Sequence, residues 1–69
     1  MKYKYDNETD ILVVTLSEEV PDFAEQKGNF ITHYSSSGIP VELEILDANE
    51  VVGDWLSVIK KQKHEAKLA

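Results

Sequence analysis

Three carboxylates alternate in one polar turn near the N-terminus, where Asp6, Glu8 and Asp10 lie within the segment DNETD. Carboxylates bind hard cations, and Ca²⁺ needs about six to eight oxygens around it. The turn has neither the central glycine nor the distant glutamate that completes a calcium loop. We therefore interpret the three residues as a solvated hairpin turn and predict no metal and no cofactor. A divalent-cation or small-ligand site at this turn is the alternative.

A second set of ionisable side chains lies in the middle of the chain. Glu42 and Glu44 alternate on one face of the segment VELEIL. A carboxylate pair does acid–base chemistry only where its surroundings separate the two pKa values, and a solvated strand face does not do this. The two histidines, His33 and His64, are too far apart in sequence for a zinc-type spacing. We predict no catalytic residue and interpret Glu42 and Glu44 as an acidic surface for a basic partner.

The net charge of −6 is unevenly distributed. Residues 1–56 hold twelve acidic side chains and three lysines, whereas residues 57–69 hold four lysines and one glutamate. Arginine, the side chain best suited to phosphates and base edges, is absent. An acidic body repels a nucleic-acid backbone, so we predict no direct nucleic-acid binding. Lys60, Lys61 and Lys63 form a candidate docking segment for an acidic surface.

The length of 69 residues fits one domain with a small core. Domains of this size usually gain stability from a disulfide, a metal or a second subunit. Because the chain has no cysteine, self-association is the expected source. No apolar run approaches the roughly 20 residues of a membrane span, and the first residues lack the hydrophobic stretch of a signal peptide. We expect a cytoplasmic protein that makes no membrane contact.

Short β-prone segments separated by polar turns must position these side chains. They are residues 2–5, 11–16, 22–26, 30–34 and 41–46. The third follows Pro21 and is at best an edge strand. In the second, Leu12, Val14 and Leu16 are expected to face the core, which leaves Val13 on the outside. An apolar residue on the outer face favours a dimer or partner surface.

The hydrophobic period changes to that of a helix after residue 47. An apolar stripe falls at helical spacing on Val52, Trp55, Leu56 and Ile59. Asp47, Asn49 or Asp54 can cap the helix, and Gly53 allows a short first turn before a longer helix. Trp55 is the obvious cover for the sheet and also a candidate interface residue. The fold class is therefore α+β: an antiparallel β-meander of four or five strands packed by one C-terminal helix.

Two sequence blocks resemble those of a prokaryotic family of domains of unknown function, family 2283. The first is Tyr5-Asp6-x-Glu8-x-Asp10 followed by Leu12-x-Val14-x-Leu16-Ser17. The second runs from Gly38 through Glu44-Ile45-Leu46-Asp47-Ala48. The resemblance implies a small β-meander with a C-terminal helix and no defined activity. Family members resemble gene-pair partners of small toxin-like proteins, which implies an antitoxin-like role.

The chain departs from the family pattern in the turn before Gly38. That turn reads Tyr34-Ser35-Ser36-Ser37, and His33 stands where the family usually has an aspartate. An acidic site in this turn is therefore not expected here.

The functional hypothesis is a non-enzymatic interaction module, homodimeric or paired with a small protein partner. The whole chain, residues 1–69, is expected to form one domain, with the sheet over residues 2–46 and the helix over residues 49–67. A small-ligand or cation-binding domain is the alternative. An enzyme is the third and least favoured hypothesis, because a fold of this size offers little room for a substrate pocket except at a dimer interface.

Overall fold

The computed structural model describes residues 2–61 and has five strands and two helical segments. The strands are β1 (Lys2–Asp6), β2 (Ile11–Thr15), β3 (Phe23–Lys27), β4 (Phe30–Tyr34) and β5 (Pro40–Ile45). The helices are α1 (Ala48–Val51) and α2 (Gly53–Lys61). This confirms the α+β class, the antiparallel sheet and the helical C-terminal part. The predicted extension of the helix from residue 62 to residue 67 lies outside the described residues.

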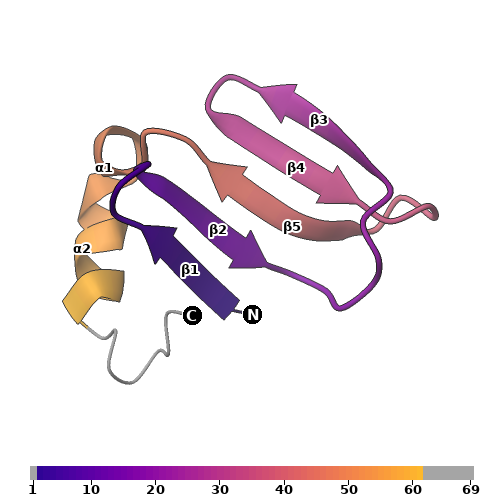
Figure 1. Cartoon of the computed structure of the whole chain (residues 1–69), viewed down its shortest axis with the longest axis horizontal. Helices are drawn as coiled ribbons and strands as arrows, with labels where there is room; N and C mark the ends of the chain where they lie inside the picture. Colours follow the sequence, from indigo (N-terminus) through magenta and orange to yellow (C-terminus); the bar gives the residue numbers. More distant parts are fainter. Residues whose placement is uncertain (1, 62–69) are drawn as a thin grey trace.

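All neighbouring strands are antiparallel, in the order β1-β2-β5-β4-β3. The meander comprises β3, β4 and β5, and the β1–β2 hairpin joins it by pairing β2 with β5. The connection from β2 to β3 therefore runs along one end of the sheet to its far edge (Figure 1). Backbone hydrogen bonds from Leu16 and Ser17 to the Val41 carbonyl fix the start of this connection. The chain thus places its first two strands beside its last.

Turns with special backbone geometry close the two tight hairpins. Asp10 ends the β1–β2 turn at φ 57°, in the left-handed region that aspartate tolerates better than most side chains. Gly28 occupies the β3–β4 turn at φ 60°, where a residue with a Cβ atom would be strained. The sequence predicted a hairpin turn at Asp10, and Gly28 lies between the segments 22–26 and 30–34 that were predicted as strands.

One face of the sheet, the inner face, carries the helices. The buried cluster consists of Leu12, Val14, Ile45, Ala48, Leu56 and Ile59, with Tyr3, Tyr5, Leu43, Val51 and Val52 packed against it. Its strand residues all have the same side-chain parity, because side chains alternate between the two faces. Both helices lie beside β1, β2 and the end of β5, away from β3 (Figure 1). The core is therefore concentrated under one half of the inner face.

The other half of the inner face, over β3 and β4, is open within residues 2–61. Every residue of β3 is exposed, as expected for the edge strand predicted after Pro21. Phe23 and Tyr34 stack with ring centroids 5.1 Å apart. These two rings shield each other in place of a helix.

Two local predictions need correction. Leu16 was expected to face the core, but β2 ends at Thr15 and the Leu16 side chain is 45% exposed. Asp47 does occupy the N-cap position of α1, but it has a left-handed backbone and its side chain makes no capping hydrogen bond. The physical reason for the second correction lies in the β1–β2 turn.

Candidate functional site

The turn that carries Asp10 is hydrogen-bonded to the start of α1. The Tyr5 hydroxyl donates to Asp10 Oδ1 at 2.7 Å. The Asn49 side-chain amide donates to the same oxygen and to the Tyr5 hydroxyl, both at 2.9 Å. The backbone N–H of Asn49 donates to Asp10 Oδ1 at 3.1 Å, and that of Ala48 donates to the Asp10 carbonyl at 2.9 Å. We call Tyr5, Asp10 and Asn49 the clasp, because they fasten the first hairpin to the first helical turn.

The clasp explains why Asp47 needs no capping side chain. The first N–H groups of a helix have no partner within the helix and are usually satisfied by the N-cap side chain. Here Asp10 satisfies those of Ala48 and Asn49 from a turn that is 39 residues away from Asn49 in sequence. Sequence reasoning missed this, because a cap was sought only among the residues next to the helix.

Electrostatics within the clasp follow from its hydrogen bonds. The hydroxyl of Tyr5 donates to the Asp10 carboxylate and lowers the pKa of Asp10 below its ordinary value, helped by the donors of Asn49. The same hydrogen bond raises the pKa of Tyr5, because the phenol must keep its proton to donate it. The clasp is therefore a carboxylate and a neutral phenol at neutral pH.

The alternative of a cation site places Asp6, Glu8 and Asp10 together, but the structure gives two of them other partners. Asp10 is engaged in the clasp, and Asp6 Oδ1 accepts the backbone N–H of Glu8 at 3.0 Å. Among residues 2–61, no three histidine or acidic side chains come close enough together to hold a metal ion. The observed contacts are those of a self-bonded turn.

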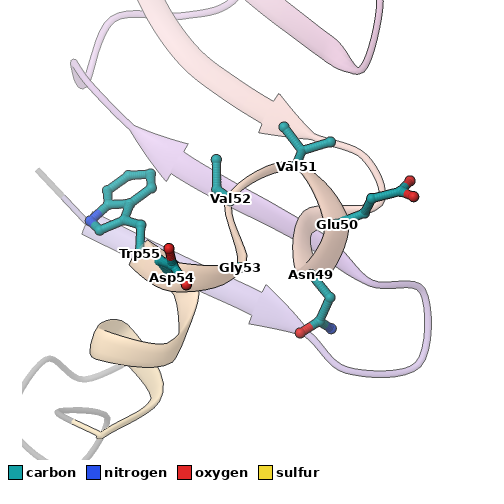
Figure 2. A pocket seen from close by; sticks show the side chains of 7 residues that line it. All are labelled: Asn49, Glu50, Val51, Val52, Gly53, Asp54 and Trp55. Carbon is teal, nitrogen blue, oxygen red and sulfur yellow. The ribbon is translucent and has the colours of Figure 1, made fainter.

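An open hollow of about 450 Å³ runs along the junction of the two helices. Its lining residues are Asn49, Glu50, Val51, Val52, Gly53, Asp54 and Trp55. Figure 2 shows that these side chains fan out in different directions from one continuous segment instead of converging on a point. Asn49, which could supply a polar group, is already bound in the clasp. This hollow lacks the converging polar groups that fix a small ligand.

The face opposite the helices, which we call the open face, has no described helix over it. Strand register places twelve side chains of β1 to β5 on it: Lys2, Lys4, Asp6, Ile11, Val13, Thr15, Ala24, Gln26, Ile31, His33, Glu42 and Glu44. One row across the sheet reads Lys4, Val13, Glu44, Ile31 and Gln26, each paired with the next. Val13, Glu42 and Glu44, all predicted as interaction residues, thus lie together.

Several contacts organise the centre of the open face. His33 Nε2 lies 2.6 Å from Glu44 Oε1, between neighbouring strands β4 and β5. This pair holds one oxygen of Glu44 in place and leaves its second oxygen as an acceptor for another group. Beside it, a hollow of about 280 Å³ is lined by Ile11 and Val13 together with Lys4, Asp6 and Thr9. The open face therefore combines an apolar floor with charges of both signs.

The remaining predicted interaction residues lie on the helical side. Trp55 is 41% exposed, and its ring meets the Tyr3 ring edge-on at 5.6 Å. Lys60 Nζ lies 4.8 Å from the centre of the Tyr5 ring, a cation–π contact. Lys61 is exposed at the end of α2, and Lys63 lies outside the described residues. The structure thus separates the basic and acidic candidates onto different sides of the sheet.

Lys2, Lys4, Ile11 and Ile31 are open-face residues that were not identified from the sequence as interaction candidates. Alternation along each strand would have placed each of them on one of two faces. Which face is shared with Val13, however, depends on the register between strands, and that register is set by tertiary packing.

Fold and contacts together define a small α+β domain whose first hairpin is fastened to the start of its helical segment. The chain matches the family described as "Protein of unknown function (DUF2283)" over residues 2–49. It therefore belongs to this family, and the matched region spans the sheet and all three clasp residues. No curated protein and no solved structure gives a match to the chain. Within residues 2–61, no helix is long and apolar enough to cross a membrane.

Proposed function

We propose that this protein is a non-enzymatic interaction module that binds a protein partner through the open face. One observation carries the proposal. Ile11, Val13 and Ile31 lie on a sheet face that no described helix covers, and all three are only partly buried. Antiparallel sheets can leave one face to water, but that face then usually carries polar side chains. Apolar side chains rimmed by charged ones are typical of a protein-binding surface.

The contacts of the other candidate surfaces support this choice. The helical hollow has diverging side chains, and the acidic turn supplies the clasp. Trp55 and Lys60 already contact Tyr3 and Tyr5. The open face combines partly exposed apolar side chains with free hydrogen-bonding capacity at the second oxygen of Glu44. An antitoxin-like role is one form of this proposal, in which the partner is a small toxin-like protein encoded beside this one.

The test is the mass in solution, by light scattering, of the full chain alone and mixed with the protein encoded beside it. Val13→Lys is the diagnostic variant, because Glu44 lies across from residue 13 and can pair with the new ammonium within the chain. Val58→Lys is the matched control, since Val58 is 51% exposed on α2. We expect Val13→Lys to abolish association and Val58→Lys to preserve it, with circular dichroism confirming that both variants fold.

Two results would contradict the proposal. One is a monomer under both conditions at all concentrations. The other is an association that Val13→Lys leaves unchanged, since binding would then involve a different surface.

A further inference from the structure

We infer that the partner on the open face is a second copy of this chain, related by a two-fold axis that runs along β2. This inference rests on the proposed function and names its partner. It follows from the order of charges across the face. β1 carries Lys2 and Lys4 on one side of β2, and β5 carries Glu42 and Glu44 on the other side.

Strand register makes this arrangement self-complementary. Lys4 and Glu44 are both paired with Val13, and Lys2 and Glu42 are both paired with Thr15. A two-fold rotation about an axis along β2 exchanges the two sides of that strand but keeps the position along it. It therefore brings Lys4 opposite Glu44 of the partner subunit and Lys2 opposite Glu42 of the partner subunit. Such a two-fold interface uses the same patch on both copies.

Two apolar residues of the face, Ile11 and Val13, fall on the axis itself. Under the same rotation, Val13 meets the partner's Val13, and Ile11 meets the partner's Ile11. The hollow lined by Ile11 and Val13 together with Lys4, Asp6 and Thr9 then lies next to the axis, and the four lysine–glutamate pairs flank the axis on both sides. A dry apolar centre inside a charged rim is the usual arrangement of protein interfaces.

Dimensions allow these contacts. Two stacked sheets lie about 10 Å apart, a gap that a lysine and a glutamate side chain span together. Aligned sheets cross at about 30°. Lys4 and Glu44 each lie one strand spacing, about 4.8 Å, from the axis. At this distance the crossing shifts the lysine relative to the partner's glutamate by only about 2.5 Å, which a flexible lysine side chain can span. The His33 contact fixes one oxygen of Glu44 and leaves the other for the partner's Lys4.

The overlap of the two sheets sets the size of the interface. With the axis along β2, the strands β1, β2 and β5 of one subunit lie over β5, β2 and β1 of the partner subunit. Three strands of about five residues cover about 250 Å² in projection, at a strand spacing of about 4.8 Å and a rise of about 3.4 Å per residue. A standard interface takes about 800 Å² of accessible surface from each partner. The accessible surface of a corrugated face exceeds its projection, but an overlap of three short strands stays below this standard size. We therefore expect a weak dimer that dissociates on dilution.

Charge reversal gives the decisive experiment. In Lys4→Glu, each residue 4 faces Glu44 of the partner subunit, and in Glu44→Lys, lysines face lysines. We expect the dissociation constant of each variant alone to rise by more than about tenfold, since like charges across an interface are strongly unfavourable. In an equimolar mixture of the two variants, every pair of residues 4 and 44 has opposite charges. The mixture should therefore form a heterodimer, which native mass spectrometry distinguishes from either homodimer.

Intrachain effects cannot produce this result. Lys4 and Glu44 of one chain are separated by β2, about 10 Å, which exceeds the Debye length of about 8 Å at physiological salt. A mixture that stays monomeric while the unaltered protein dimerises would overturn the β2 axis. An unaltered protein that is monomeric alone, but binds its encoded neighbour in a way that Val13→Lys abolishes, would overturn the second copy and leave the proposed function standing.

Discussion

The two faces of β2 both carry aliphatic side chains, but these side chains are buried to different extents. Leu12 and Val14 on the inner face are 0% and 3% exposed, whereas Ile11 and Val13 on the open face are only partly buried. The difference is what lies over them: α1 and α2 cover the inner face at this strand. An apolar strand residue is thus a core residue or an interface residue according to the presence of a covering element, and its identity alone does not decide between the two.

The clasp holds that cover in place. Within residues 2–61, α1 has four residues and α2 has nine, and helical segments of these lengths are not stable in isolation. Contacts with the sheet and the hydrogen bonds of Tyr5, Asp10 and Asn49 must hold them on β1 and β2. Three changes should therefore weaken the covering of the inner face: removing a buried helix side chain, removing a hydrogen bond of the clasp, and protonating Asp10 at low pH.

The largest loss of folding stability is expected from truncating a fully buried side chain of the helices that cover the inner face. Leu56→Ala deletes a side chain that is 0% exposed against the sheet, and such deletions cost about 2–5 kcal/mol. A domain of 69 residues has about 3–10 kcal/mol of stability in total. We expect Leu56→Ala to be largely or partly unfolded at 25 °C, measured by urea unfolding with circular dichroism.

Phe23→Ala is the matched control for Leu56→Ala. It deletes a larger side chain from the half of the inner face that has no described helix, where Phe23 is 44% exposed. We expect a loss below about 1.5 kcal/mol, limited to its stacking on Tyr34. Equal losses in the two variants would show that the helices do not create the difference.

A smaller effect is expected from weakening the clasp. Tyr5→Phe removes one hydroxyl, and with it the donor to Asp10 and the acceptor for Asn49, while the ring stays in place beneath Lys60. The clasp is partly open to water, so the loss should be about 1 kcal/mol or less. Hydrogen exchange should show faster exchange of the Asn49 amide with little change at Val14. Uniform acceleration at both sites would instead indicate that the clasp and the core open together.

The smallest effect is the pH dependence that the clasp confers. The pKa of Asp10 is lowered in the folded state, chiefly by the Tyr5 hydroxyl. Its contribution is therefore complete above the unfolded aspartate pKa of about 3.9 and is lost as the pH falls through the lower, folded value. Asp10→Asn keeps a side chain that tolerates the left-handed backbone but cannot titrate. We expect the stability difference between the two proteins to shrink below about pH 4 in thermal unfolding. Parallel curves from pH 6 to pH 2 would contradict this linkage.

Residue composition, turn residues and periodicity predicted the elements of the fold. The alternation of Glu42 and Glu44 within VELEIL and the stripe of Leu56 and Ile59 indicated a strand and a helix, because these periods follow from backbone geometry. Gly53 correctly marked the break between α1 and α2. Local patterns could not predict the strand order, because the pairing of β2 with β5 joins segments that are about thirty residues apart.

At the candidate sites, too, local sequence determines some relations between residues, and tertiary structure determines the others. The sequence by itself determined that Val13 faces away from Leu12 and Val14, and that Glu42 and Glu44 share a face, since both follow from the two-residue period of a strand. Only the tertiary structure decided that Val13 lies beside Glu44, that Lys4 flanks it on the other side, and that Asp10 caps a distant helix. Those relations depend on strand register and on where the helices pack, and both are set by the burial of the whole core and not by any local run of residues.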